Sequence, residues 1–521
     1  MENRTEIFDS TLRDGAQGEG IAFSVEDKLN IVRALDAFGI AYIEAGNPGS
    51  NPKDLEFFER VKSVRLKHAK LCAFGSTRRR DIRVEDDENV RSLLSADTPV
   101  ITLFGKSWDL HVTHILNTTL DENLRMIEET VRFFKERGKE VIYDAEHFFD
   151  GYRANADYAI KTLKAAADGG ADCLCLCDTN GGADPNFVYD ITRQVHEMFA
   201  VRIGIHCHND TGMAVANSIF GVKAGAAQVQ GTFIGFGERC GNANLSTIIA
   251  NLQLKYGYEC VPSSLMSNLT PTARQIAEIA NVTLASGEPY VGKSAFAHKG
   301  GMHIDGVNKI SKSFEHVDPQ SVGNERRFLM SEVSGRTTLL KLIQKIDPSL
   351  KKDSPQTKVI IQTLKELEHD GYQFEAASAS FELVVRKELG LYQPFFKLDH
   401  YKILGESPAK SASECATAVI KVNVDGKDEI TAEQGNGPVN ALDKALRKAL
   451  VVFYPCLRDV HLTDYKVRVL ETQDATAAKV RVLIETSDGT DVWTTVGVSG
   501  DIIEASWNAL VDSIEYKLTK K

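Results

Sequence analysis

The chain has 521 residues and a formal net charge of −11, and 43% of its residues are hydrophobic. This length suits roughly two to four domains, and the acidic balance argues against nucleic acid or an anionic membrane as the main partner. No apolar run reaches about 18 residues, the N-terminal residues show no apolar signal segment, and the nine cysteines include no CxxC pair. Free thiols in this number suit a reducing compartment, so we expect a cytoplasmic protein.

Eight strand-like segments recur in the first half of the chain, with helix-like segments between them. They are Glu6–Thr11, Ala41–Ala45, Lys70–Phe74, Val100–Phe104, Glu140–Ala145, Asp172–Cys177, Val201–His206 and Ala227–Phe233. Their ends are spaced roughly 30 residues apart, which predicts parallel strands in a closed (β/α)8 barrel. An open doubly wound sheet is disfavoured because no glycine-rich phosphate loop follows the first strand.

Helix signals lie between these strands. Ser24 and Asp27 predict a capping box at the start of a helix that runs to about Phe38. Gly39 follows as a C-terminal signal. Further helices are expected from Asp121 to Gly138 and over Ala156–Ala167.

The pattern changes after about Gly257. Residues 262 to 390 are expected to be mainly helical, with an interruption at Gly287–Val307, and a junction of low order is expected near Gly390–Lys410. An α+β region then follows. Its expected strands are Ala416–Val424, Tyr465–Glu471, Ala478–Thr486 and Asp491–Val498, and its expected helices are Pro438–Val452 and Asp501–Lys517. We therefore expect a barrel over 1–261, a helical linker subdomain over 262–398 and an α+β domain over 399–521.

The stretch Gly204–Asp210 contains a His-x-His pair at the end of a predicted buried strand. Residues two apart on a strand project from the same face, so His206 and His208 can approach one cation while Cys207 points to the other face. Alone this is a weak signal, because paired surface histidines are common. It gains weight from Arg13 and Asp14, which follow the first predicted strand.

Polar groups recur at the carboxyl ends of the predicted strands, which is where (β/α)8 enzymes have their active sites. They are Arg13 and Asp14 after strand one, Asp144 and Glu146 after strand five, Thr179 after strand six, His206 and His208 at strand seven, and Asn242 after strand eight. A single buried carboxylate is as often a paired core residue, but five such strand ends favour one site. By contrast, Cys173, Cys175 and Cys177 are expected to be small apolar filler inside the barrel.

Two imidazoles, a carboxylate and an amide oxygen form a donor set that leaves positions open for substrate. The expected ligands are Asp14, His206, His208 and Asn242. Mg²⁺ or Mn²⁺ fits this set, and Zn²⁺ remains an alternative. Such an ion beside Arg13 could bind a 2-oxo acid, and the guanidinium would stabilise an alkoxide formed at the keto carbon. Glu146 faces the same mouth as a candidate base.

Five motifs resemble those of the 2-isopropylmalate, homocitrate and citramalate synthase family. They are Leu12–Gln17, His206–Asp210, Gly237–Asn242, Ala297–Gly306 and Gly435–Leu442. Together they extend over nearly the whole chain. Related lyases share the barrel and the metal residues, but they usually carry a cysteine-bearing glycine loop near strand eight and lack a regulatory domain.

The resemblance implies roles for individual residues. It places the metal on Asp14, His206 and His208, with Asn242 near or on it. It places Arg13 on the keto oxygen, Glu146 in catalysis, and Thr179 and Asp144 among the substrate-binding residues. It gives His303 a role in acetyl-CoA deprotonation or thioester hydrolysis. It also implies acetyl-CoA as co-substrate, a homodimer, and a C-terminal regulatory domain with isoleucine as effector. Where these synthases tend to have a tyrosine, the chain has Asn324–Arg327, so the residue that assists hydrolysis stays open.

The acceptor has to be inferred from the neighbours of Glu146. The aromatic stretch His147–Tyr152 resembles the pyruvate-using branch of the family, and we expect it to narrow the pocket around pyruvate's methyl group. One or two methylenes in a pocket are worth only about 1–3 kcal/mol. We therefore expect condensation of acetyl-CoA with pyruvate to citramalate in isoleucine biosynthesis. The alternatives are 2-isopropylmalate synthase, homocitrate synthase, an acyl-CoA lyase, and an inactive barrel that senses a metabolite.

Overall fold

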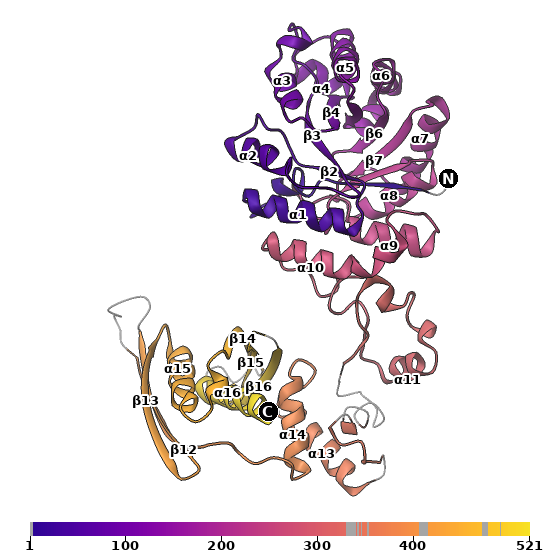
Figure 1. The fold of residues 1–521 in the computed structure, drawn as a ribbon. Helices are drawn as coiled ribbons and strands as arrows, with labels where there is room; N and C mark the ends of the chain where they lie inside the picture. The colour runs from indigo at the N-terminus through magenta and orange to yellow at the C-terminus, as the bar shows by residue number, and fades with distance from the viewer. Residues whose placement is uncertain are drawn as a thin grey trace. The chain divides into compact units, whose positions relative to one another are not determined.

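The computed structural model describes residues 4–329, 340, 343–344, 346–351, 354–405, 415–470, 478–489 and 491–520. By internal contacts the chain divides into two compact units (Figure 1). The first consists of Met1–Ala297 with Glu315–Arg327, and the second of His298–Phe314 with Phe328–Lys521. Each unit is described by itself below.

The first unit is a closed eight-stranded barrel, which confirms the predicted fold. The strands are β1 (Glu6–Asp9), β2 (Tyr42–Glu44), β3 (Lys70–Ser76), β4 (Val100–Lys106), β5 (Glu140–Glu146), β6 (Cys173–Asp178), β7 (Arg202–Cys207) and β8 (Gln228–Gly231). Each strand pairs in parallel with the next, and β8 closes the barrel on β1 with Gly231 opposite Asp9. β1 ends before the predicted Thr11, because the Asp9 carboxylate accepts a hydrogen bond from the Thr11 amide and turns the chain.

Helices cover the outside of the barrel (Figure 1). They are α1 (Val25–Phe38), α2 (Pro52–Val61), α3 (Glu88–Ser95), α4 (Asp109–His114), α5 (Leu120–Lys135), α6 (Phe148–Asp168), α7 (Pro185–Met198), α8 (Ala214–Lys223), α9 (Leu245–Lys255) and α10 (Leu269–Ile279). The predicted capping box is present: the Ser24 hydroxyl accepts from the Asp27 amide, and the Asp27 carboxylate accepts from the Ser24 amide. Gly39 ends α1 with φ 96°, a conformation that favours glycine.

Helix α6 differs from the prediction. It begins at Phe148 instead of Ala156, and Asn155 interrupts it with φ −154° and ψ 81°. His147 adopts φ 56° at its N-terminus and turns the chain directly from β5 into the helix. The aromatic residues after Glu146 therefore belong to the first turn of a helix, where the sequence pattern predicted the rim of a pocket.

Two apolar clusters stabilise the barrel unit. The larger one fills the space between the strands and the surrounding helices. The smaller one lies inside the barrel and consists of Phe8, Tyr42, Cys72, Val100, Ile142, Cys173, Cys175 and Cys177. The three alternating cysteines are thus free and buried, and burial raises the pKa of each thiol, as expected of apolar filler.

The second unit contains helices and two antiparallel three-stranded sheets. Its helices are α11 (Gly301–Lys309), α13 (Pro355–His369), α14 (Ser378–Glu388), α15 (Pro438–Val451) and α16 (Ile502–Thr519). One sheet contains β11 (Lys397–Gly405), β12 (Ala416–Val424) and β13 (Lys427–Gly435), and the other contains β14 (His461–Val469), β15 (Val480–Ser487) and β16 (Val492–Ser499). Short strands β9 (Ala297–His298) and β10 (Arg327–Phe328) lie where the chain passes between units.

The predicted C-terminal strands and helices are present, although their ends differ from the predicted ones. The prediction of a low-order junction near Gly390–Lys410 is wrong. Strand β11 occupies Lys397–Gly405, within the segment expected to lack structure. Strand β13 was also missed, because both strands are polar and largely exposed and so lack an apolar run. Residues 406–410 of the predicted junction and Glu471 of the predicted strand lie outside the described residues. Among the helices that the structure describes, none has the length and apolar character needed to cross a membrane.

Candidate active site

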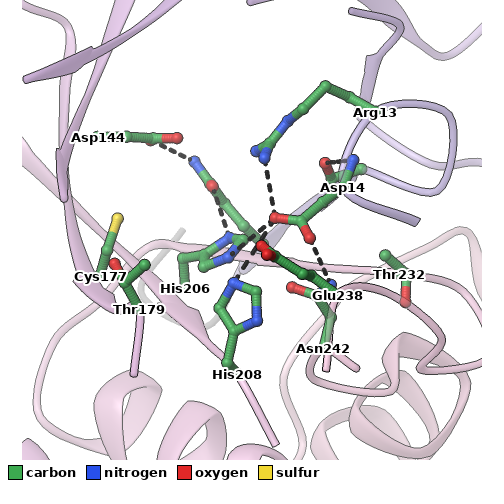
Figure 2. A network of polar contacts seen from close by, with 12 residues as sticks. Arg13, Asp14, Asp144, Cys177, Thr179, His206, His208, Thr232, Glu238 and Asn242 are labelled. Carbon is green, nitrogen blue, oxygen red and sulfur yellow. Dashed lines mark hydrogen bonds and ion pairs between the residues drawn. The ribbon is translucent and has the colours of Figure 1, made fainter. Parts of the chain in front are cut away.

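A buried cluster of one carboxylate and two imidazoles lies at the carboxyl ends of β1 and β7 (Figure 2). The candidate ligand atoms of Asp14, His206 and His208 all lie within 4.8 Å of one another. Asp14 Oδ2 is 3.6 Å from His206 Nε2 and 3.7 Å from His208 Nε2. The alternation of β7 directs Cys207 into the outer core instead. The predicted His-x-His arrangement is therefore present.

The protonation states of this cluster suit a divalent cation. Burial alone would raise the pKa of Asp14, but the charge of the Arg13 guanidinium holds it well below its usual range. Burial lowers the pKa of His206 to about 3 and also lowers that of His208. The carboxylate is thus ionised and both imidazoles are neutral, which is the state required of metal ligands.

Hydrogen bonding leaves the facing nitrogens free to coordinate. Gln230 Oε1 lies 3.2 Å from His206 Nδ1 and accepts a hydrogen bond from its N–H, so that Nε2 keeps its lone pair toward Asp14. His208 Nδ1 is buried and has no hydrogen-bond partner among the described residues. The two acceptor nitrogens and the carboxylate oxygen form no hydrogen bonds with one another. Since each presents a lone pair, they are better suited to coordinating one cation than to bonding each other.

Asn242 lies directly behind Asp14. Its Nδ2 donates to Asp14 Oδ1 at 2.9 Å, while its Oδ1 is buried without a partner in the described part of the chain. Gly237 makes this approach possible, because a Cβ there would lie 2.2 Å from Asn242 Nδ2. In this arrangement Asn242 orients Asp14, and its role as a ligand stays a prediction.

Arg13 is held in place by a partner that the motifs did not reveal. Arg13 Nε donates to Glu44 Oε2 at 2.6 Å, and Nη1 donates to Asp14 Oδ2 at 2.8 Å. Ser10 donates to the same Glu44 oxygen at 2.6 Å, and the guanidinium lies 3.8 Å from the centre of the Phe74 ring. The guanidinium of Arg13 is therefore held on one side by these contacts, and its other side faces the barrel mouth.

A cavity of about 210 Å³ opens above these groups. It is lined by Arg13, Asp14, Gln17, Phe74, Phe104, Asp144, Glu146, Cys177, Thr179, His206, His208 and Glu238. Seven of the predicted site residues thus surround one cavity. Asn242 lies behind its wall, and His303 lies on α11 in the second unit, where its ring stacks on Phe314 at 4.3 Å.

The remaining polar groups of the cavity differ in their partners. Thr179 Oγ1 accepts a hydrogen bond from the His147 amide at 2.9 Å, which leaves its own proton free to donate. Glu146 forms an ion pair with Lys106. Burial, with a further contribution from the charge of Glu44, raises the pKa of Asp144 to about 7. Gln230 donates to Asp144 at 2.9 Å.

The prediction that the aromatic stretch narrows the pocket is wrong. Phe148 and Phe149 are buried in the outer core, because the turn at His147 directs the first turn of α6 away from the barrel mouth. The aromatic walls are instead Phe74 from β3 and Phe104 from β4, whose rings stack with centres 5.1 Å apart. Both residues ended predicted strands, but each is followed by a glycine, so no polar group at these two strand ends pointed to the site.

The fold and the site together define a class of enzyme. Residues 4–280 match the HMGL-like family, residues 290–371 the homocitrate synthase post-HMGL domain-like family, and residues 375–518 the LeuA allosteric (dimerisation) domain. A barrel with a candidate divalent-metal cluster at its mouth, followed by an allosteric domain, is typical of acetyl-CoA-dependent condensing enzymes.

Comparison with curated proteins identifies the family more closely. The chain is 52% identical over 521 residues to "(R)-citramalate synthase" of Aquifex aeolicus (strain VF5), covering 100% of this chain and 99% of the relative. It is 50% identical to the "(R)-citramalate synthase" of Synechocystis sp. (98% and 96% covered). It is 32% identical to a "Probable 2-isopropylmalate synthase" of Methanopyrus kandleri (99% and 98% covered). The chain belongs to the (R)-citramalate synthase family, which confirms the resemblance drawn from its motifs.

Proposed function

We propose that the chain condenses acetyl-CoA with pyruvate and water to give citramalate and free CoA. The observation that carries the proposal is one small cavity in which the Asp14–His206–His208 cluster lies beside an oriented Arg13 and two aromatic walls. Membership of the (R)-citramalate synthase family supports the same reaction.

Asp14, His206 and His208 would hold a divalent cation, with Mg²⁺ or Mn²⁺ favoured and Zn²⁺ as the alternative. Bound there, the cation would act as a Lewis acid on the acceptor's keto group. Arg13 donates toward the same oxygen and stabilises the negative charge that develops on it as the acetyl carbanion attacks. Thr179 has a free hydroxyl proton for the acceptor's carboxylate.

The acidic groups at the cavity have separate tasks. Glu146, with Lys106 beside it, faces the cavity as the candidate base for the acetyl methyl group. Asp144 lies deeper, bonded to Gln230, which also binds His206. Asp144 therefore supports the orientation of His206 through Gln230 and borders the acceptor's position.

We expect pyruvate to be preferred over both 2-oxoisovalerate and 2-oxoglutarate, because Phe74 and Phe104 leave room for a small side chain. The measurement is kcat/KM for each acceptor, from the release of free CoA at fixed acetyl-CoA. Phe104→Ala should shift this preference toward 2-oxoisovalerate by about tenfold or more. Phe148→Leu, a change in the outer core, is the matched control and should leave the preference unchanged. If the unaltered chain used 2-oxoisovalerate more efficiently than pyruvate, a 2-isopropylmalate synthase would be favoured instead.

We also propose that His303 takes part in proton transfer to or from the acetyl group or the hydrolytic water. It is exposed in the first turn of α11, shortly after glycines at 300 and 301, and so its ring is accessible for proton transfer. We expect His303→Ala to lower kcat about 10²-fold with little change in pyruvate binding. His369→Ala, at the end of α13, is the control. Near-normal turnover of the His303 variant would return this histidine to a structural role.

The C-terminal domain is proposed to form a homodimer and to bind isoleucine as an effector. The match of residues 375–518 to an allosteric (dimerisation) domain supports this role. The test needs the full chain, because Val496 of β16 belongs to the same core cluster as Phe374 and Phe381, so a cut near Leu398 would expose it. We expect isoleucine to inhibit turnover. Because coupling between two binding sites is reciprocal, pyruvate should weaken isoleucine binding by the same factor by which isoleucine weakens pyruvate binding. Calorimetry measures the binding of isoleucine and of pyruvate, with leucine as the comparison ligand, and sedimentation gives the mass of the oligomer. If an active chain bound no isoleucine, the proposal that isoleucine is the effector would be refuted.

A further inference from the structure

One arginine, Arg239, joins three loops at the mouth of the barrel. The loop after β8 contributes Arg239 itself, the loop after β7 contributes Asp210, and the loop after β6 contributes Thr179. Arg239 Nε donates to Asp210 Oδ1 at 2.8 Å, and Nη2 donates to Oδ2 at 3.0 Å, so the ion pair is bidentate. The same Nη2 donates to the Thr179 carbonyl at 2.6 Å. A single guanidinium therefore binds both neighbouring loops.

The backbone of Arg239 has a conformation that this residue type rarely adopts. Its φ is 56°, which lies in the left-handed region and costs free energy for residues other than glycine. The Gly241 amide closes the turn around it by donating to the Glu238 carbonyl at 3.0 Å. Such a conformation persists where surrounding contacts compensate for it. Here the side chain of Arg239 supplies that compensation through its bonds to Asp210 and Thr179.

Thr179 is held at both of its oxygen atoms. Strand β6 ends at Asp178, which lies opposite Cys207 of β7, so the Thr179 carbonyl lies beyond the paired part of the strand. Its donor is the Arg239 guanidinium. The Thr179 hydroxyl oxygen accepts from the His147 amide at 2.9 Å, and its proton stays free to donate. The first contact fixes the peptide and the second fixes the side chain, which lines the catalytic cavity.

Asp210 is packed closely against the same β6 loop. A Cβ at Gly181, where φ is 63°, would lie 2.6 Å from Asp210 Oδ2, and the Thr211 hydroxyl donates to the Gly181 carbonyl at 2.7 Å. The side chains of Arg239 and Asp210 are 38% and 23% exposed. Ion pairs that reach solvent in this way contribute little to the stability of a fold. A bidentate guanidinium nevertheless fixes direction well, so this contact is better suited to placing Thr179 than to stabilising the barrel.

We propose that Arg239 is a positioning residue for the acceptor: through the Thr179 carbonyl it holds the Thr179 hydroxyl where that group binds the carboxylate of the 2-oxo acid. The inference rests on the proposed function, in which Thr179 donates to that carboxylate. The described wall of the catalytic cavity does not include Arg239, so the arginine acts through Thr179. Because the carboxylate is bound equally in the ground state and in the transition state, a weaker contact raises KM and leaves kcat nearly unchanged.

The variants Arg239→Gln and Thr179→Val and their combination test this role in the full-length, metal-loaded enzyme. We expect each single variant to raise the KM for pyruvate about tenfold, while kcat and the KM for acetyl-CoA change less than about twofold. The combined variant should match Thr179→Val within about twofold, because no hydroxyl is left to position. Arg239→Lys should raise the KM for pyruvate by only about threefold, since an ammonium can keep one of the two contacts. Arg60→Gln, which breaks an exposed ion pair with Glu26 between α1 and α2, is the matched control and should change none of these values.

Calorimetry of acceptor binding separates this proposal from the proposed reaction, because it reports affinity without turnover. If the unaltered chain used another 2-oxo acid, the assignment of pyruvate would fall, while the same variants titrated with that acid would still test Arg239, since every 2-oxo acid carries the carboxylate. Losses that multiply in the combined variant would show that Arg239 acts independently of Thr179 and would overturn the proposal. An unchanged KM for pyruvate in Arg239→Gln, an equal rise in the KM for acetyl-CoA, or no binding of any 2-oxo acid by the unaltered chain would overturn it as well.

Discussion

We expect His208→Ala to abolish divalent-metal binding and to lower kcat by at least about 10³-fold, because a Lewis acid at the keto group is worth several kcal/mol. His208 is buried, its Nε2 faces Asp14 Oδ2 at 3.7 Å, and burial keeps its imidazole neutral. With alanine there, one nitrogen donor and one side of the cluster are lost. Metal content measured by elemental analysis should fall together with turnover, while circular dichroism should show an intact barrel.

The matched control for this experiment is His114→Ala, an exposed histidine at the end of α4 in the same unit. It should retain both metal and activity. Chelation of the unaltered enzyme should abolish turnover, and added Mg²⁺ or Mn²⁺ should restore it. Full turnover in a preparation shown to be free of metal would refute the assignment of Asp14, His206 and His208.

The architecture of the barrel could be predicted because it has a strong periodic signal. Eight buried parallel strands leave apolar runs at regular spacing, and the carboxyl ends of those strands meet at one mouth. The cluster of Asp14, His206 and His208 followed from this rule together with the two-residue period of β7. These features depend on local pattern and fold class, and so they are visible in the sequence.

Features that depend on side-chain direction could not be predicted in the same way. Glu44 ends a short strand as a lone carboxylate, and only the structure shows it paired with Arg13. The pocket walls were misplaced for a related reason: the backbone turn at His147, with φ 56°, sends Phe148 into the core, and no residue type in that stretch requires such a turn. Which aromatic residues line the cavity thus depends on a backbone angle that the sequence does not specify.

The second large effect is expected at Arg13. We expect Arg13→Gln to lower kcat about 10³-fold, because removing a donor aimed at a developing oxyanion costs about 10²–10³-fold and here the positive charge is lost as well. Arg13→Lys keeps the charge, but an ammonium cannot bond Glu44 and Asp14 and also extend a planar fork into the cavity. We therefore expect a loss of about 10²-fold for lysine.

Glu44 allows the orientation of Arg13 to be tested separately from its charge. Glu44→Gln keeps the size of the side chain and leaves Arg13 charged, but it replaces the ion pair at 2.6 Å by a neutral contact. We expect kcat to fall by about tenfold with the KM for pyruvate nearly unchanged, because a freer guanidinium still attracts the carboxylate yet is less often aimed at the keto oxygen. Arg33→Lys, on the exposed side of α1, is the control. If Glu44→Gln raised KM without lowering kcat, Arg13 would serve ground-state binding of the acceptor, and stabilisation of the alkoxide would have to come from other groups at the mouth of the barrel.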